Sequence, residues 1–416
     1  MNNYERYADW QVDKDRGICT RIMDAKDVDL KKIPPLKNIF KQSDSLHAQC
    51  PVIWCKDNQE LGDLEKCTGL FVKANFWTLT DAFILLDSAI KNLPVGSDIV
   101  IFLPLLRGRG SGASFDKSQL KSWPFAHAFT WQTIFSVFHD MGLRKMWREN
   151  CESQSAGIYY FTAKTSVPPT RHMLSVVMPV FNEKSTFLKT FDRVYKKVSS
   201  MEHIDFELII IESNSTDGTK ELVASKTDIE CVSVIWQDRP QGKGFAAREG
   251  IENATGTIIL IQDADDEYDV EDYDVLIDAI VAGKAPFLLG ARDTSDWRMR
   301  AFHSAGFRSF LYNAGHIFFT GFLNFLVNTK MKDPFTMYKV FLRDCVSGLG
   351  FICKRFDFDH ELVIKLVRKG FVPPEYVVSY KSRSHEEGKK VSILKDGLFW
   401  ISTDLKLRLS KLKPKL

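Results

Sequence analysis

The stretch that most restricts the fold is the apolar run at residues 257–261, which leads directly into an acidic run at 262–267. A run of β-branched and aliphatic residues of this length is typical of a buried strand in a parallel sheet. Asp263 and Asp265 then lie at the end of that strand, where open α/β sheets bind ligands. The pair, with Glu267 close behind, suits a hard divalent cation that is shared with substrate phosphates. The alternative is an acidic turn that only ends a strand and begins the next helix.

The segments before this run alternate between strand and helix patterns. Strands are expected at 174–180, 206–211 and 232–236, and amphipathic helices follow, the last of them beginning near Gly242. Turn-forming polar residues follow the first two strands, at 182–183 and 212–219. We therefore predict a mostly parallel α/β sheet with one ligand crevice at the carboxyl ends of its strands.

The composition sets limits on the class of protein. A chain of 416 residues is long enough for two domains, and 44% hydrophobic with 26% charged residues is ordinary globular composition. The net charge of +3 is too small to indicate nucleic-acid binding. The first thirty residues contain no signal-peptide core, and the eight scattered cysteines are unlike a disulfide framework. We expect a cytoplasmic protein that does not bind nucleic acid.

Residues 1–165 are expected to form a small α/β domain, with a strand at 98–103, a helix at 131–141 and a strand at 157–162. This order, with a Gly-rich loop at 108–112, resembles the C-terminal half of a class I methyltransferase. The half that would hold the S-adenosylmethionine loop has no counterpart in residues 1–70. The resemblance therefore implies a truncated domain with a scaffold or docking role.

Residues 173–405 resemble a family 2 glycosyltransferase with the nucleotide-sugar-binding GT-A fold. The motifs that carry the resemblance occur in the family's order, at residues 179–183, 215–219, 242–244, 263–265, 333–339 and 383–390. The tail at 380–389 is most similar to dolichyl- or polyprenyl-phosphate sugar synthases. The implied fold class is α/β, with a Rossmann-like GT-A domain at 173–416 preceded by the smaller α/β domain.

The resemblance implies a site for a nucleoside diphosphate sugar, with GDP or UDP as the nucleotide. Pro179, Phe181 and Glu183 would line the nucleoside pocket. Asp263, Ala264 and Asp265 would meet the ribose, the diphosphate and a metal, Mg²⁺ or Mn²⁺, with Glu267 as a further metal ligand. The other implied donor-site residues follow the second strand or open a helix: Ile211, Glu212, Ser213 and Lys243.

Basic residues complete the implied site. Arg292 matches a family arginine near the diphosphate, and Arg383 and Lys389 match basic residues on a segment that closes over the site. Asp333 and Lys339 keep the outline of a family loop. Metal and cations would neutralise the charge that grows on the leaving nucleoside diphosphate. The residues expected to act in catalysis are Asp265, Asp333 and Arg383.

Three positions depart from the family pattern. Ser213 stands where an aspartate usually reads the base, so the identity of the base is open. Phe181 replaces a tyrosine and keeps its stacking face without the hydroxyl. Lys339 stands where dolichol-type enzymes carry an arginine, and a lysine provides a cation without bidentate geometry.

Two helical patterns bear on the acceptor. Residues 309–329 contain no acidic or basic residue except histidine, and polar residues recur there at spacings of three and four: Asn313, His316, Thr320, Asn324 and Asn328. Such a helix is expected in a bilayer interface or against the catalytic domain. An apolar stripe at 394–412, with lysines off the stripe, predicts a basic amphipathic helix attracted to anionic lipid. The alternative is that both stripes are ordinary core faces.

We expect a polyprenyl phosphate acceptor, inversion at the anomeric carbon and peripheral contact with the cytoplasmic face of a membrane. Two other functions stay open: transfer to a soluble or saccharide hydroxyl, and a non-catalytic scaffold that binds nucleotide sugars. Asp263, Asp265 and Arg383 argue against the scaffold, since a scaffold has no need of them. A nucleotidyltransferase is disfavoured because its first strand should lead into a Gly-rich loop with a basic residue.

Overall fold

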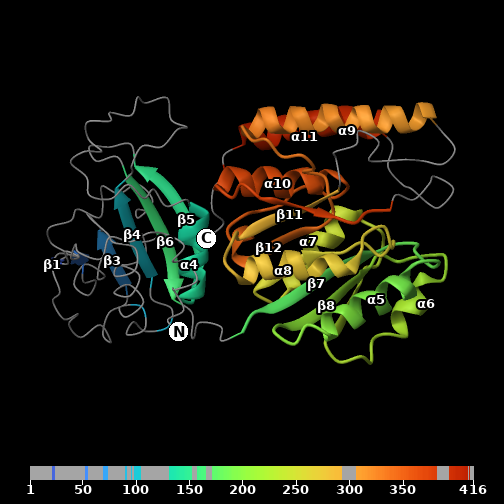
Figure 1. Ribbon diagram of the computed structural model, residues 1–416, viewed down its shortest axis with the longest axis horizontal. Helices are drawn as coiled ribbons and strands as arrows, with labels where there is room; N and C mark the ends of the chain where they lie inside the picture. The colour runs from blue at the N-terminus through green and yellow to red at the C-terminus, as the bar shows by residue number, and fades with distance from the viewer. Residues whose placement is uncertain are drawn as a thin grey trace. The chain divides into compact units, whose positions relative to one another are not determined.

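The computed structural model divides the chain into two compact units, Met1–Pro169 and Thr170–Leu416 (Figure 1). In the second unit the structure describes residues 171–292, 306–381, 393–410 and 412. In the first it describes residues 21–23, 52–54, 69–73, 90, 95, 98–104, 131–151 and 157–164. The Gly-rich loop at 108–112 lies outside the described residues.

The N-terminal unit contains a six-stranded sheet in the order β1-β2-β3-β4-β6-β5. Its elements are β1 (Arg21–Met23), β2 (Val52–Trp54), β3 (Gly69–Lys73), β4 (Asp98–Pro104), α4 (Trp131–Asp140), β5 (Leu143–Cys151) and β6 (Gly157–Lys164). The predicted strand, helix and strand are thus present as β4, α4 and β6. β5 was not predicted, because a register shift between Arg144 and Trp147 breaks its alternation. The resemblance to a methyltransferase stays a prediction.

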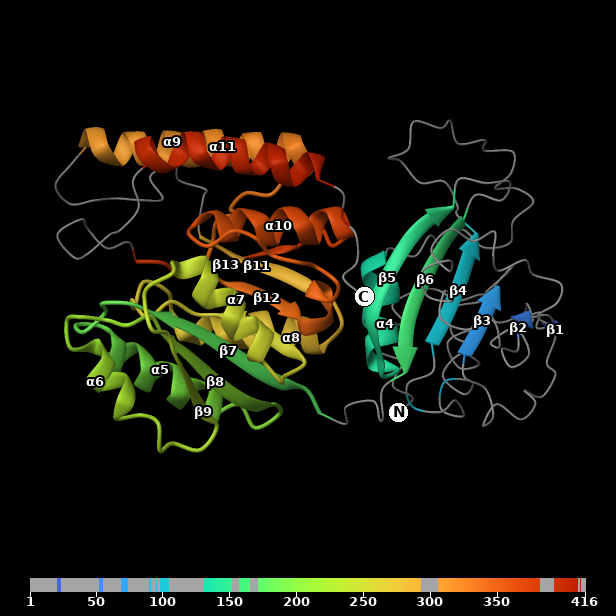
Figure 2. The same ribbon diagram turned by 180° about the vertical axis from the view of Figure 1, so that it is seen from behind.

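The C-terminal unit is built on a seven-stranded sheet in the order β13-β11-β12-β10-β7-β8-β9 (Figure 2). The strands are β7 (Met173–Val180), β8 (Asp205–Glu212), β9 (Val232–Trp236), β10 (Ile258–Ile261), β11 (Phe287–Arg292), β12 (Lys339–Leu342) and β13 (Glu375–Val378). All neighbouring pairs are parallel except the two that β12 makes, with β10 and β11. The predicted mostly parallel sheet is confirmed.

The central strands are largely apolar because both faces of the sheet are covered. Every residue of β10 and of β11 is buried. Helix α7 (Lys243–Asn253) packs on β7 and β8, and α8 (Tyr273–Val281) packs on β11 and β12. Helices α5 (Phe187–Ser199) and α6 (Thr219–Ala224) pack on β8. This α/β arrangement brings the polar ends of the parallel strands to one edge of the sheet.

Three further helices form layers beyond the sheet (Figure 1). Helix α10 (Asp357–Lys369) contacts α7, and α9 (Gly306–Val327) and α11 (Ile393–Leu409) lie side by side against α10. None of the helices in the described ranges is both long and apolar enough to cross a bilayer.

The inward face of α9 is mixed, with the apolar Phe319 and Leu323 buried beside polar residues. Its polar residues Asn313 and Thr320 are buried, whereas Phe325 is 83% exposed. On α11, Asp404 is fully buried and Leu409 is 80% exposed. Asn313 and Thr320 of the polar stripe therefore pack against the protein, Asn328 is exposed, and both helices present some apolar side chains outward.

Candidate functional site

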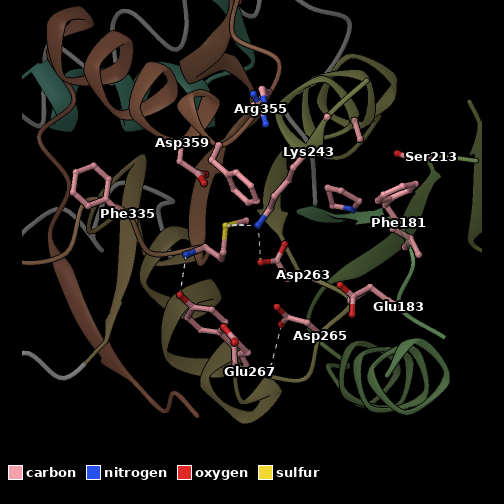
Figure 3. A pocket seen from close by; sticks show the side chains of 18 of the residues that line it. Phe181, Glu183, Ser213, Lys243, Asp263, Asp265, Glu267, Phe335, Arg355 and Asp359 are labelled. Carbon is pink, nitrogen blue, oxygen red and sulfur yellow. Dashed lines mark hydrogen bonds and ion pairs between the residues drawn. The ribbon is translucent and has the colours of Figure 1, made fainter. Parts of the chain in front are cut away.

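A pocket opens at the carboxyl ends of β7, β8, β10 and β11 (Figure 3). Phe181 and Ser213 lie on one side of it, and Phe335 and Asp359 lie on the opposite side, with Lys243 and the acidic turn between them. The side chains that line it come from the strand ends, from α7 and from the start of α10: Pro179, Val180, Phe181, Glu183, Ser213, Pro240, Gly242, Lys243, Ala246, Asp263, Ala264, Asp265, Glu267, Tyr268, Arg292, Phe335, Met337, Arg355, Phe356, Asp359 and Tyr380.

The loop after β7 is fixed to the loop after β8. Asn182 has a positive φ of 52°, and its side-chain Oδ1 accepts a hydrogen bond of 2.9 Å from the backbone N–H of Thr216. The backbone N–H of Glu183 donates to Thr219 Oγ1 at 3.0 Å. Asparagine tolerates this left-handed backbone better than most residues, so the local sequence favours the turn. Phe181 and Glu183 are thereby held at the pocket wall.

Two residues that were assigned to the donor site lie behind the wall. Ile211 is fully buried in β8. Glu212 is 1% exposed, and its carboxylate accepts the backbone N–H groups of Asn214 and Ser215 at 3.0 and 2.7 Å. Glu212 therefore shapes the loop that carries Ser213, and only Ser213 of the three lines the pocket.

The acidic turn after β10 is held from two sides. Thr186 Oγ1 donates to the carbonyl oxygen of Ala264 at 2.9 Å. Asp266 has a φ of 57°, and its carboxylate pairs with Lys189 and Arg193 of α5. These two cations outweigh the effect of partial burial and lower the pKa of Asp266. The turn that points Asp263 and Asp265 into the pocket is thus fixed by side chains outside it.

Lys243 stands at the start of α7 and pairs with the first carboxylate of the turn. Its Nζ is 2.7 Å from Asp263 Oδ2 and 3.0 Å from Met337 Sδ. Burial alone would lower the pKa of Lys243, but the attraction of Asp263 and Asp359 raises it above its ordinary value. The preceding Gly242 has a φ of 101°, and a Cβ there would collide with the carbonyl oxygen of Lys354. Only glycine brings the two segments this close.

Arg292, at the end of β11, is locked by Asp333. Its Nε and one terminal nitrogen each donate to the carboxylate of Asp333 at 2.7 Å, and its backbone N–H donates at 3.1 Å. Asp333 is fully buried and does not line the pocket, whereas Arg292 lines it and lies 5.1 Å from the ring of Tyr380. Asp333 is thus placed to orient Arg292 from behind.

Lys339 has the same kind of position as Asp333. It is fully buried, donates to the carbonyl oxygen of Thr336, and its Nζ is 3.0 Å from Asp359 Oδ1. Burial lowers the pKa of Lys339. Asp359, which does line the pocket, was not identified from the sequence. It stands in the first turn of α10, and the clue was the acidic pair Asp357 and Asp359 at the start of an amphipathic segment.

The loop before α10 was also missed, and it supplies Arg355 and Phe356 to the pocket. Glu361, fully buried in α10, holds this loop by accepting the backbone N–H of Ile352 and Cys353 at 3.0 and 2.8 Å. The loop in turn accepts the backbone N–H of Phe245 on the carbonyl oxygen of Lys354 at 2.9 Å. Contacts between segments about a hundred residues apart therefore build this wall.

The predicted metal ligands are only partly brought together. Across the described residues, no three acidic, histidine or cysteine side chains are grouped to hold a metal ion. Asp263 faces Lys243, and Glu267 accepts the hydroxyl of Tyr380 at 2.9 Å. A cation of the Mg²⁺ type is commonly held by one or two carboxylates with substrate phosphates and water. Asp263 and Asp265, two oxygen donors on one turn of the pocket wall, fit that mode of binding.

Ten of the predicted site residues line one pocket: Pro179, Phe181, Glu183, Ser213, Lys243, Asp263, Ala264, Asp265, Glu267 and Arg292. Ile211, Glu212, Asp333 and Lys339 lie behind it. Arg383 and Lys389 lie outside the described residues, which end at Lys381 on this segment. Their predicted roles stay predictions.

Comparison with known proteins gives the family of part of this unit. The family model described as Glycosyl transferase family 2 matches residues 175–349. This segment is a family 2 glycosyltransferase domain. The fold is therefore the GT-A class of α/β fold. The loops after β7 and β10 lie inside the matched segment, and α10 and α11 lie beyond it.

The chain is also similar to curated proteins of known name. The Low-salt glycan biosynthesis hexosyltransferase Agl6 of Haloferax volcanii is 26% identical over 228 residues, which are 54% of this chain and 51% of that protein. The Dolichyl-phosphate beta-glucosyltransferase ALG5A of Trichomonas vaginalis is 30% identical over 118 residues, 27% of this chain and 36% of that protein. The chain thus spans about half the length of the first relative and about a third of the second.

One solved structure with a similar chain is the glucosyl-3-phosphoglycerate synthase of Mycobacterium tuberculosis, crystallised with Mn²⁺, uridine diphosphate and phosphoglyceric acid. The TM-score is 0.42 at 17% sequence identity, over 58% of this chain and 80% of that one.

Proposed function

We propose that this protein transfers a sugar from a nucleoside diphosphate sugar to the phosphate of a polyprenyl phosphate. The observation that carries the proposal is the pocket itself, which is lined by two turn carboxylates and by Lys243 and Arg292, with Asp263 paired to Lys243, at the edge of a glycosyltransferase sheet. One relative, a dolichyl-phosphate glucosyltransferase, supports a lipid phosphate as the acceptor.

The arrangement of the pocket supports an orientation for the donor. Phe181 offers a flat face for the base, with Ser213 beside it, and a serine hydroxyl can hydrogen-bond a base without charge. Lys243 and Arg292 would then meet the diphosphate, because both are cations on the pocket wall. The sugar would lie toward Phe335 and Asp359, on the far side of the pocket. GDP and UDP are both compatible with this arrangement.

A divalent cation, Mg²⁺ or Mn²⁺, would be held by Asp263 and Asp265 together with the diphosphate. When bound, it would neutralise part of the charge on the leaving group. Lys243 pairs with Asp263 here, and its ammonium can turn to the diphosphate as the nucleotide enters. Glu267, which binds the Tyr380 hydroxyl, would support the turn rather than complete the ligand set.

The proposed chemistry is a single displacement. An oxygen of the acceptor phosphate attacks the anomeric carbon, the bond from that carbon to the diphosphate breaks, and the nucleoside diphosphate leaves with the electron pair. One displacement inverts the anomeric configuration. A phosphate is already anionic near neutral pH, so no general base is required, and the chain contributes cations that stabilise the leaving group. Arg383 is a further candidate, since it is three residues beyond the pocket residue Tyr380.

The outer helices support peripheral contact with a membrane, where such an acceptor is found. Phe325, Phe318 and Ile317 of α9 are 83%, 57% and 59% exposed, and Leu409 of α11 is 80% exposed. Lys406 and Arg408 lie in the last turn of α11. Apolar side chains beside basic ones are typical of helices that lie in a bilayer interface. We propose the cytoplasmic face as the side of contact.

A second candidate is transfer to a hydroxyl, and the observation that favours it is Asp359. Its carboxylate lines the pocket on the side opposite the proposed nucleoside position and is paired with the buried Lys339. A hydroxyl that attacks the anomeric carbon must lose its proton, and Asp359 is placed to accept it.

The experiment is transfer of a labelled sugar from a panel of GDP- and UDP-sugars, with Mg²⁺ or Mn²⁺, to a short polyprenyl phosphate in detergent. Soluble sugars and peptides serve as hydroxyl acceptors in parallel. The proposal expects product on the lipid phosphate, and it expects Asp359→Asn to retain that activity in part. Transfer to hydroxyl acceptors alone, abolished by Asp359→Asn, would establish the second candidate instead.

A further inference from the structure

Phe335, on the side of the pocket away from Phe181, is packed between two histidine rings. Its ring centroid is 4.4 Å from that of His360 on α10, at an interplanar angle of 31°. It is 5.8 Å from that of His316 on α9, at 86°. Phe335 also lines the pocket (Figure 3). The two histidines therefore set the position of a ring that bounds the space farthest from the proposed nucleoside position.

His360 is itself fixed by the last helix. Its Nδ1 is 3.1 Å from each carboxylate oxygen of Asp404 on α11, and its ring is 5.2 Å from that of Trp400. His360 is 4% exposed and Asp404 is fully buried. The structure shows no other hydrogen bond to the Asp404 carboxylate from any residue it describes. A carboxylate in this position is costly to bury without a partner, so the imidazole orientation is determined by Asp404.

We propose that His360 and Asp404 are positioning residues for the acceptor side of the pocket, acting through Phe335. The proposal rests on the proposed function, because it takes the space beside Phe335 as the place where the acceptor approaches the sugar. It makes α11, which lies beyond the segment matched by the glycosyltransferase family model, part of the acceptor site.

A purely structural role would not need this pair. Apolar side chains of similar size would pack α10 on α11 at no desolvation cost, and buried ion pairs often stabilise a protein less than such replacements. The polar pair fixes the plane of the His360 ring, because Nδ1 of His360 lies within hydrogen-bond distance of both carboxylate oxygens of Asp404. Phe335 packs against that ring at a tilt of 31°, so its position at the pocket wall depends on this contact.

The experiment is a double-mutant cycle in which the KM for the acceptor is measured. His360→Asn keeps an N–H for Asp404 but removes the ring, and Phe335→Leu removes the ring on the other side of the contact. Each should raise the KM for a short polyprenyl phosphate about three- to tenfold, the range expected for one aromatic pair. The dissociation constant for the nucleoside diphosphate should stay unchanged. The acceptor KM of the double variant should not exceed the higher of the two single-variant values, because His360 acts through Phe335.

The control is His203→Asn, which removes a histidine–aspartate pair on the surface, where His203 lies 3.1 Å from Asp278. It should change neither constant. The proposal is overturned if the two effects on the acceptor KM multiply, or if nucleotide binding weakens to the same extent as acceptor binding. It is also overturned if His360→Asn has no effect while Phe335→Leu has one.

If the unmodified protein transfers sugar to no acceptor, the proposed function fails, and a measurement without turnover decides the positioning role. Hydrogen exchange at the amides of Asp333 and of residues 335–337 should rise in His360→Asn and in Phe335→Leu, with no change at β7 and β8. Unchanged exchange at Asp333 and at residues 335–337 in His360→Asn would refute the role of the pair.

Discussion

Replacement of Asp333 by asparagine should destabilise the C-terminal unit far more than a surface change of the same kind. The carboxylate is fully buried and makes two side-chain contacts of 2.7 Å with Arg292, whose side chain is 5% exposed. Asparagine keeps the volume but removes the charge, which leaves the guanidinium buried without a counter-ion. Breaking a buried pair in this way costs about 3–5 kcal/mol.

The titration of Asp333 gives a second measure of the same contact. Burial alone would raise its pKa, but Arg292 outweighs burial and lowers it from the ordinary 3.8 to about 2. A carboxyl whose folded-state pKa is depressed stabilises the protein above its unfolded-state pKa. That stabilisation is lost as the pH falls from about 4 toward about 2, and a shift of this size corresponds to about 2.5 kcal/mol.

The assay is urea unfolding with hydrogen exchange at the β11 amides, which isolates the C-terminal unit in the full chain. The matched control is Asp205→Asn, since Asp205 pairs with Arg171 at 3.2 Å with both side chains largely exposed. Exposed pairs contribute about 0.2–1 kcal/mol. The reasoning is refuted if Asp333→Asn costs no more than the control. It is also refuted if the difference between the two variants persists unchanged at pH 2.

Three further predictions concern the pocket and the outer helices. Asp265→Asn should abolish sugar transfer and Mn²⁺ binding measured by paramagnetic resonance in the presence of nucleotide, with the fold unchanged by circular dichroism. The double variant Phe325→Glu, Leu409→Glu should bind anionic lipid vesicles at least about tenfold more weakly in a sedimentation assay, because burial of each such side chain contributes about 1.5–3 kcal/mol. The control is Val377→Glu on β13, where Val377 is 70% exposed, and it should not weaken vesicle binding. Arg383→Ala should reduce affinity for the nucleotide sugar by about 1.5–3 kcal/mol in calorimetry, as one lost charge-assisted contact would, and equal affinity would contradict its place over the diphosphate.

Strands β7, β8, β9 and β10 could be predicted because each is a largely apolar run, whereas β11, β12 and β13 of the same sheet were not predicted. The predicted ranges 174–180 and 232–236 agree with β7 and β9 to within one residue. The start of α7 could be predicted because Gly242 allows a backbone conformation that other residues avoid. The acidic turn could be located because a parallel sheet carries its ligand crevice at the carboxyl ends of its strands.

The positions of single charged residues could not be predicted in the same way. Asp333 and Lys339 looked like site residues, yet both are buried because a partner far along the chain compensates their charge: Arg292 for Asp333 and Asp359 for Lys339. The residues next to Asp333 and Lys339 in the sequence do not indicate which distant residue will pair with each of them. The same limit hid Asp359, which α10 carries to the pocket, and Phe335, which contacts rings on α9 and α10.

The outer helices illustrate a different limit. The spacing of polar and apolar residues on α9 was correct, but periodicity alone does not tell which face points inward. In α9 the inward face includes Asn313 and Thr320, and Asn324 binds the backbone of Met331 through two hydrogen bonds of 2.7 and 2.9 Å. Backbone groups just beyond the helix satisfy the amide of Asn324, so this polar residue can face the protein.

The most direct test of the account compares two acceptors that differ only in the phosphate. The purified protein is given a labelled nucleotide sugar, Mg²⁺ or Mn²⁺, and either a short polyprenyl phosphate or the corresponding polyprenol in the same detergent, and the products are analysed by mass spectrometry. The account predicts a sugar joined through phosphate to the lipid, of inverted anomeric configuration, and no product with the alcohol. Transfer to the polyprenol at a comparable rate, or to neither lipid while a soluble hydroxyl acceptor is glycosylated, would contradict it.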